Sequence, residues 1–351
     1  MKTEISFQSA DHTFRIFGDL YFPDDFNENA STLLPGILIV SGSGPLDRNG
    51  NAPTMKLNTS NRFAEHIVSS RSAERAIAVI SYDKRGTGKS MKKDDKNLYY
   101  RAGMMDLVAD AIEAVKYLAS DPRIDRKKII VLGHSEGAII MPLICKGVIE
   151  SGLEPVFGCI FYCGFGENVK DAMDLQADAV KKEIRELTGP KGWILRTVAS
   201  EEKIDRQRKD FFDKVNGPDE PDFISMQCGL VKQSAKWIRE HCEFNAQECL
   251  AQNISCHCLA ITGCKDFQVR DEFCKPEVAH GLVPKALSIE VHRPTNLTHA
   301  LRSSEGPSKI LDINKDYTKM GKLPLDGEVL SITDAWLDKI VFEGDTVASA
   351  R

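Results

Sequence analysis

The sequence predicts an α/β fold in which helices flank a mostly parallel, eight-stranded sheet and a helical cap is inserted into the chain. Three observations lead to this prediction. Two segments of alternating apolar and polar residues open the chain, and six short, continuous apolar runs follow them. Stretches with helical periodicity separate these runs. One connection is far longer than the roughly one dozen residues that a crossover between parallel strands needs.

The first two predicted strands, Thr3–Ser9 and Thr13–Tyr21, are expected to form an antiparallel hairpin, because only a short polar turn separates them. The six later runs lack polar alternation, which is typical of strands covered on both faces in a parallel sheet. These runs are Gly36–Val40, Ala76–Tyr82, Lys128–Leu132, Phe157–Cys163, His257–Ile261 and Leu287–Val291.

Apolar residues at spacings of three and four predict helices between the strands. One such pattern occupies Met104–Leu118, and the turn at Ser120–Pro122 is expected to end it. Further stripes occupy Ile139–Ile144, directly after a strand, and Leu330–Ile340 near the end of the chain. Strands that alternate with helices after an antiparallel start indicate an α/β protein with a mostly parallel sheet.

The long connection separates the fourth and fifth apolar runs, and its patterns are helical. Met173–Leu187 carries an apolar stripe that Gly189–Pro190 is expected to end, while Phe211–Phe212 and Leu230–Ile238 suggest further helices. We therefore expect residues 1–165 and 255–351 to form the core and residues 166–254 to form a helical cap, or lid.

The composition is that of a globular protein, with 42% hydrophobic and 28% charged residues. A net charge of −5 and the lack of a dense Lys/Arg stripe argue against nucleic-acid binding. No apolar run approaches the ~18 residues of a membrane span, and Met1–Phe7 alternates like a strand rather than a signal peptide. The ten cysteines are scattered without a zinc or thioredoxin spacing. We therefore expect reduced thiols in a cytoplasmic protein.

The pentapeptide Gly133–Gly137 reads Gly-His-Ser-Glu-Gly, and its central Ser135 is the candidate nucleophile. A predicted strand leads into it, and Ala138–Met141 begins a helix directly after it. A sharp strand–turn–helix connection exposes a serine hydroxyl in strained backbone geometry, and the two glycines remove side chains that would collide there. The helix start also directs partial positive charge at an oxyanion. The alternative is a glycine-rich turn with an incidental serine.

A serine hydroxyl needs a base, and the base needs an acid to orient it; with this turn the acid precedes the histidine in the chain. Asp266 follows the next-to-last strand, where that strand's carboxyl end should reach the serine, and Asp271 is the rival acid. His299 follows the last strand at the same sheet edge. The rival histidines are His292, at the end of that strand, and His280, in a helix-like segment before it.

An oxyanion hole needs two backbone N–H donors, one from the residue after the nucleophile and one from a loop after a neighbouring strand. The first donor would be Glu136. The second should come from the loop Ser41–Pro45, where Ser43 is the preferred residue and Gly44 the runner-up. Taken alone, this loop would be an ordinary glycine-rich turn.

Three ordered segments, Ser41–Asn51, Tyr82–Ser90 and Gly133–Gly137, resemble those of the α/β hydrolases grouped around dienelactone-hydrolase-like esterases and serine aminopeptidases. The resemblance covers about Ile5–Phe165 and Ser255–Phe342. It does not extend to the cap. It implies the α/β-hydrolase fold and hydrolysis of an ester, thioester or amide.

The resemblance also implies a catalytic triad of Ser135, His299 and Asp266. The sequence departs from the family pattern at two points. Ser41–Gly42 stands where the oxyanion loop usually has His-Gly, which leaves the identity of the second donor open. Dienelactone hydrolases proper use a cysteine nucleophile, so the serine found here favours esterase-like chemistry.

Two further motifs lie close to these segments. The turn Asp83–Arg85 is expected to tie loops together by ion pairs and hydrogen bonds. Asp47 and Arg48 follow the oxyanion loop, and from there we expect them to be able to contact substrate.

The predicted protein is a serine carboxylesterase-type hydrolase that acts on a small-molecule ester with a small or medium acyl group. The chemistry needs neither a metal ion nor an organic cofactor. The alternatives on the same fold are an aminopeptidase, which needs an acidic group such as the side chain of Glu136 to hold a free amine, and a thioesterase. An alternative of another class is a hydrolase scaffold that binds a ligand without catalysis. The sequence does not indicate an oligomeric state.

Overall fold

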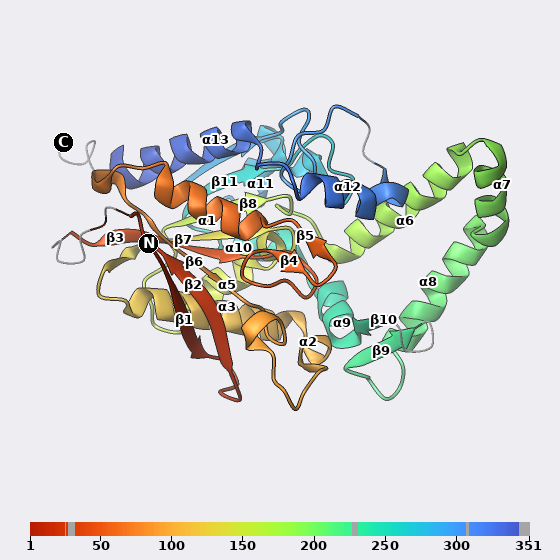
Figure 1. Cartoon of the computed structure of the whole chain (residues 1–351), viewed down its shortest axis with the longest axis horizontal. Coiled ribbons are helices and arrows are strands. Elements are labelled where there is room, and N and C mark those ends of the chain that lie inside the picture. The colour runs from red at the N-terminus through yellow and green to blue at the C-terminus, as the bar shows by residue number, and fades with distance from the viewer. Residues whose placement is uncertain (25, 27–31, 227–230, 307–308, 344–351) are drawn as a thin grey trace.

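The computed structural model describes residues 1–24, 26, 32–226, 231–306 and 309–343. An eight-stranded sheet forms its centre, with the strand order β1-β2-β6-β3-β7-β8-β11-β12 (Figure 1). The strands are β1 (Lys2–Gln8), β2 (Arg15–Tyr21), β3 (Leu34–Val40), β6 (Ala78–Tyr82), β7 (Ile124–His134), β8 (Gly158–Tyr162), β11 (His257–Ile261) and β12 (Ser288–His292). β2 runs antiparallel to both β1 and β6, and all other neighbouring pairs are parallel. The predicted fold class is therefore confirmed.

Helices cover both faces of the sheet (Figure 1). Their apolar sides belong to two separate clusters of buried residues, one for each face. The first face carries α3 (Met104–Ser120), α5 (Met141–Glu150), α10 (Ala246–Asn253) and α11 (Pro276–Leu282), and the second carries α1 (Thr59–Ser69) and α13 (Gly327–Leu337). α3 ends at Ser120, where the sequence predicted its end.

Strand β3 shows why the apolar runs are continuous. Every residue of β3 is buried. Leu38 and Val40 pack into the cluster under α3, whereas Ile37 and Ile39 pack into the cluster under α1 and α13. Successive side chains of a strand point to opposite faces, so a strand covered on both sides must be apolar throughout.

The segment between β8 and β11 contains more than the helices expected of a cap. It consists of α6 (Val169–Glu186), α7 (Gly189–Val198), α8 (Glu201–Val215), the hairpin β9 (Phe223–Met226) and β10 (Val231–Ser234), α9 (Ala235–Glu243) and α10. Helices α6 to α8 form an arm that reaches away from the sheet, with α7 at its far end (Figure 1).

The structure differs from the prediction at two places in this segment. Gly189–Pro190 not only ends α6 but also begins α7, because a proline is tolerated in the first helical turn, where its missing N–H costs nothing. Val231–Ser234, within the stretch Leu230–Ile238 that was expected to be helical, forms strand β10 instead; Leu230 lies outside the described residues. The division into core and cap stays a prediction. Helix α10, which it assigns to the cap, packs on the main core through Leu250, as does Ile254 directly after the helix.

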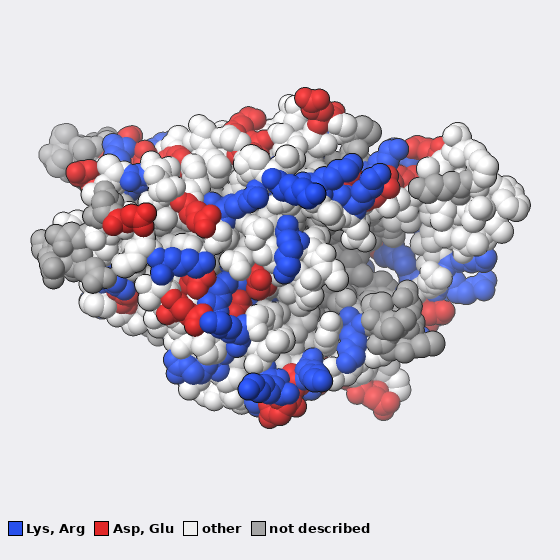
Figure 2. Space-filling model, in the orientation of Figure 1, with Lys and Arg blue, Asp and Glu red and all other residues white. Residues whose placement is uncertain are grey.

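Shorter elements complete the chain. They are β4 (Asn51–Ala52), β5 (Met55–Lys56), α2 (Leu98–Arg101), α4 (Glu136–Ile139) and α12 (Ile313–Met320). Acidic and basic side chains share the face shown in Figure 2. No helix among the described residues is long and apolar enough to cross a membrane. Nine of the ten cysteines are described, all as free thiols, and Cys228 lies outside the described residues.

Candidate active site

Ser135 lies in a tight turn between β7 and α4, and its backbone is strained. Its φ of 54° and ψ of −119° lie in a region that residues with a side chain seldom occupy. A Cβ atom on Gly133 would lie 2.3 Å from the carbonyl oxygen of Gly137, and one on Gly137 would lie 2.1 Å from that of Val40. Only glycine fits at either position, so the Gly-x-Ser-x-Gly pattern follows from the packing of the turn.

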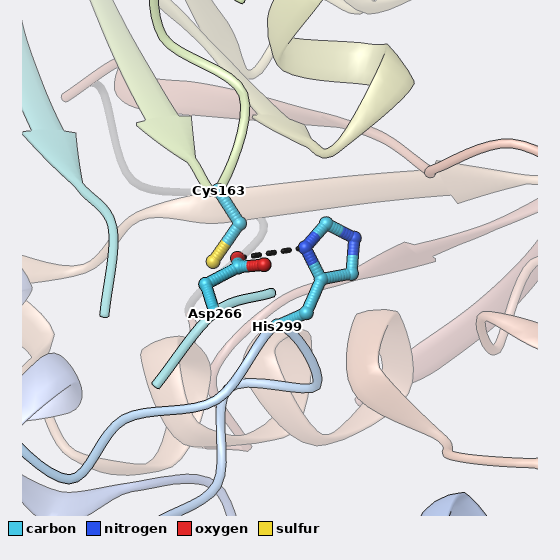
Figure 3. Close-up of side chains that lie close together, drawn as sticks. All are labelled: Cys163, Asp266 and His299. Carbon is cyan, nitrogen blue, oxygen red and sulfur yellow. Dashed lines mark hydrogen bonds and ion pairs between the residues drawn. The ribbon is translucent and has the colours of Figure 1, made fainter. Parts of the chain in front are cut away.

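The carboxyl ends of β7, β11 and β12 bring three side chains into one hydrogen-bonded chain. Nε2 of His299 lies 2.9 Å from Oγ of Ser135, and its Nδ1 lies 2.8 Å from Oδ2 of Asp266. Figure 3 shows the bond between imidazole and carboxylate. The other carboxylate oxygen of Asp266 accepts the backbone N–H groups of Gln268 and Val269, at 2.8 and 3.1 Å. These bonds fix the direction in which the carboxylate faces the imidazole.

The rival residues lie elsewhere and have other partners. Asp271 pairs with Arg293 at 2.6 Å. His292 lies 2.9 Å from Glu290, and Nδ1 of His280 lies 2.7 Å from the carbonyl oxygen of Pro276, within its own helix. The structure therefore brings Asp266 and His299, and none of the rivals, to Ser135.

The proposed oxyanion donors lie around the same hydroxyl group. Ser43, Gly44 and Glu136 line the cavity that Ser135 and His299 also line. Among the described residues, no backbone or side-chain acceptor takes the N–H group of Ser43 or of Glu136. Burial raises the pKa of Tyr99, and the N–H of Gly44, which faces that phenol, partly offsets the rise. Ser43 therefore stays the preferred second donor and Gly44 the runner-up.

Comparison with known proteins agrees with this fold. A family model described as serine aminopeptidase, S33, matches residues 57–182. The proline iminopeptidase of Mycobacterium smegmatis superposes with a TM-score of 0.53 at 14% identity over 96% of this chain and 98% of that one. An esterase from Pyrococcus furiosus superposes with a TM-score of 0.52 at 14% identity, over 97% and 90% of the two chains. The chain therefore has the α/β-hydrolase fold.

A relative with detectable sequence similarity is the esterase EstD of Thermotoga maritima. It is 29% identical over 201 residues, which are 51% of this chain and 47% of EstD. The chain therefore spans about half the length of the curated relative that it matches.

His134, the second residue of the pentapeptide, supports the loop that carries His299. Its Nε2 lies 2.8 Å from the backbone carbonyl oxygen of His299. Burial, together with the nearby His299 ring, lowers the pKa of His134 to about 3, so its imidazole is neutral at pH 7 and donates to that carbonyl. Sequence reasoning gave His134 no role.

Cys163 lies directly beside the triad. Its Sγ faces the carboxylate of Asp266 (Figure 3), and burial, followed by the charge of Asp266, raises the pKa of this thiol. Among the described residues, Cys163, Asp266 and His299 are the one group of three or more side chains whose donor atoms lie close enough to hold a metal ion. Their carboxylate and imidazole already bind one another.

Glu136 is buried and connects three parts of the molecule. Its carboxylate lies 2.8 Å from Nζ of Lys84, accepts the indole N–H of Trp237, and lies 3.3 Å from Nε2 of His241. Burial alone would raise the pKa of Glu136, but the charge of Lys84 and the contact with His241 outweigh it and lower this pKa to about 2. The carboxylate is therefore charged at pH 7. The sequence predicted that the turn containing Lys84 ties loops together but did not show that Lys84 contacts Glu136.

Two cavities meet at the hydroxyl group of Ser135. The larger, of about 440 Å³, extends between the core and the inserted segment; the smaller, of about 120 Å³, lies toward β5 and α12. Ser43, Ser135, Gln268 and His299 line both. The larger cavity has apolar walls that include Ile139, Val169, Met173, Phe211 and Trp237, with Lys232 and Gln176 as polar members.

Asp47 and Arg48 are not at the site, which corrects the expectation of substrate contact. Arg48 is buried and directed away from the cavities, where it pairs with Asp19 and Asp83, at 2.8 Å each. Asp47 accepts backbone N–H groups of its own loop, at Asn49 and Asn51. Neither residue lines a cavity that reaches Ser135. Their position in the sequence showed that Asp47 and Arg48 follow the oxyanion loop, but it did not show the direction in which their side chains point.

Proposed function

We propose that this protein is a serine hydrolase that cleaves carboxylic esters through Ser135, His299 and Asp266. The observation that carries the proposal is the unbroken chain of hydrogen bonds, 2.9 and 2.8 Å long, from the hydroxyl of Ser135 through His299 to Asp266. It lies at the wall of a cavity of about 440 Å³, large enough for a small-molecule substrate.

The roles follow from the geometry. His299 takes the proton of Ser135 as the hydroxyl oxygen attacks the ester carbonyl, and Asp266 stabilises the resulting imidazolium. The N–H groups of Ser43 and Glu136 stabilise the oxyanion. The intermediate collapses, the C–O bond to the alcohol breaks, and His299 returns the proton to the leaving oxygen. A water molecule then attacks the acyl-enzyme with His299 as base, which releases the acid and restores Ser135.

An ester is favoured over a peptide with a free amino terminus because the larger cavity offers no available acid. Recognition of a charged amine needs an unpaired carboxylate. The one acidic residue among the described lining residues is Glu136, and its carboxylate is already bound by Lys84 and Trp237. Lys232, by contrast, lines the cavity and would repel an ammonium group.

The two cavities suggest where the acyl and alcohol parts of an ester would bind. Since both reach Ser135, the acyl and alcohol parts can extend to opposite sides of the scissile bond, one into the larger cavity and one into the smaller. This favours an ester with one small and one medium-sized part, the larger in contact with Phe211 and Trp237.

The test is hydrolysis of p-nitrophenyl esters from acetate to dodecanoate, beside aminoacyl anilides, by the wild type and Ser135→Ala. We expect ester cleavage with an optimum at short or medium acyl chains, slow anilide cleavage, and no turnover by the variant. A fluorophosphonate probe should label the wild type at Ser135. Rapid anilide cleavage with slow ester cleavage would contradict the esterase proposal and favour an aminopeptidase. If the probe fails to label the folded wild type, a non-catalytic scaffold is favoured.

A further inference from the structure

We propose that Lys84 is a positioning residue that holds both donors of the oxyanion hole through one ammonium group. The proposal rests on the proposed function, because it assigns the two donors to Ser43 and Glu136. It gives a role to the turn after β6, which sequence analysis regarded as purely structural.

The ammonium group of Lys84 lies between the two loops that supply the donors. The residue is only 4% exposed. Its Nζ donates to the backbone carbonyl oxygen of Gly42 at 2.5 Å and to Oε2 of Glu136 at 2.8 Å. Gly42 belongs to the loop after β3, and Glu136 is the first residue of α4. One side chain thus joins two backbone segments on either side of Ser135.

The bond to Gly42 orients the N–H group of Ser43. These two groups belong to the same peptide unit, which is planar and trans, so its carbonyl oxygen and N–H hydrogen point in opposite directions. Fixing the oxygen on Lys84 leaves the N–H directed away from Lys84. Ser43 lines the cavity at Ser135, so an N–H group held in this way is available to an oxyanion there.

The bond to Glu136 holds the other donor. The N–H of Glu136 lies at the start of α4, and its side chain is tied at one carboxylate oxygen by Lys84 and at the other by Trp237. The backbone of Glu136 can therefore not rotate without breaking a buried ion pair, and a donor held in advance stabilises an oxyanion without reorganisation.

The next residue in the chain supplies a matched comparison. Arg85 forms an equally buried ion pair with Asp110, with bonds of 2.7 Å from Nε and from NH2, on the side of the turn that faces α3. This pair touches neither the oxyanion loop nor Glu136. If Lys84 only stabilised the fold, neutralising either pair would have similar effects on catalysis.

The experiment compares two double variants, Lys84→Met/Glu136→Gln and Arg85→Met/Asp110→Asn, each of which removes a whole buried ion pair. Asp11, which Arg85 also contacts at 3.4 Å, is 44% exposed, so its charge stays solvated. The readouts are kcat and KM for a p-nitrophenyl ester, and the inhibition constant of an alkyl trifluoromethyl ketone, whose adduct with serine carries an oxyanion. Near-ultraviolet circular dichroism gives the folded fraction, and Lys84→Arg tests rescue.

For Lys84→Met/Glu136→Gln we expect kcat to fall by about 10- to 100-fold, less than the ~10²–10³-fold cost of deleting a donor outright. Inhibitor affinity should fall by the same factor, with KM within about threefold, since the donors act mainly in the transition state. Arg85→Met/Asp110→Asn should keep kcat and inhibitor affinity, and Lys84→Arg should recover most of the loss.

Equal kcat and equal inhibitor affinity in the two folded double variants would overturn the proposal. If Lys84→Met/Glu136→Gln does not fold, Lys84→Gln, which is too short to reach Gly42 but keeps a polar partner for Glu136, decides the question by the same readouts. Failure of the proposed function is recognised separately, because the wild type would then hydrolyse no ester and Ser135→Ala would change nothing.

Discussion

Replacing Glu136 by glutamine should make the stability of the protein depend differently on pH. The pKa of Glu136 is lowered from 4.5 to about 2 in the folded protein. A difference of about 2.5 units corresponds to about 3 kcal/mol of stability at pH 7, at 1.36 kcal/mol for each unit. The side chain is only 2% exposed, so solvent screens this contribution little.

The sign follows from the direction of the shift. Because the folded-state pKa of Glu136 lies below the unfolded one, its stabilisation is complete above about pH 5 and is lost as the pH falls from 4.5 toward 2. The difference in unfolding free energy between wild type and Glu136→Gln should therefore be about 3 kcal/mol at pH 7 and about half of that at pH 3. The variant also leaves Lys84 without its anion, and the cost of this adds to the difference in unfolding free energy by an amount that stays constant between pH 7 and pH 3.

Urea unfolding followed by circular dichroism at several pH values measures this difference. Glu113→Gln is the control, because Glu113 forms a partly exposed pair with Lys116 at 2.7 Å, and such surface pairs contribute at most about 1 kcal/mol. A difference between wild type and Glu136→Gln that stays constant from pH 7 to pH 3, or grows as the pH falls, would refute the argument that Glu136 is a buried, ion-paired carboxylate.

Three further predictions concern the turn, the triad and the corrected arginine. Gly137→Ala should cost about 3 kcal/mol or more of unfolding free energy in a urea titration, because the new Cβ would lie 2.1 Å from a backbone oxygen; Gly217→Ala, with no atom nearer than 3.4 Å, is the control and should change it little. Asp266→Asn should leave the fold intact and lower kcat in the ester assay by about 10⁴-fold, since the amide no longer holds the required imidazole tautomer; retention of more than a tenth of the activity would contradict the assigned acid. Arg48→Met should lower the unfolding free energy by about 3–5 kcal/mol because it leaves the buried Asp83 without its ion-pair partner, whereas Asp19 keeps Lys2. The KM of the folded enzyme should stay unchanged, and a large rise in KM would indicate that Arg48 contacts substrate.

Local sequence patterns predicted most of the fold. The apolar runs predicted the six later strands because a strand buried on both faces admits few polar residues, and β11 has the predicted bounds, His257–Ile261. The hairpin β9–β10 was missed because its strands are four residues long, too short for their alternation to stand out from a helical pattern.

The candidate site likewise contains residues that the sequence predicted and residues that it did not. Ser135, Asp266 and His299 could be placed from sequence because each follows a strand, and parallel strands bring their carboxyl ends to one edge. The roles of Lys84 and Trp237 could not be predicted from the sequence, because these residues contact Glu136 only through side chains that join segments distant in the chain. Chain order shows where a backbone turns, but the direction of a long side chain depends on packing that no local pattern encodes.

The bond from Trp237 to Glu136 also gives the protein a built-in optical reporter. The chain has three tryptophans in three surroundings: Trp193 on the arm is 67% exposed, Trp336 in α13 is 2% exposed, and Trp237 lines the larger cavity. The emission of an indole depends on its contact with water and with nearby charge. With Trp193 and Trp336 replaced by phenylalanine, the remaining fluorescence would come from the cavity wall alone. The entry of an unlabelled molecule could then be followed in real time, before any bond is broken.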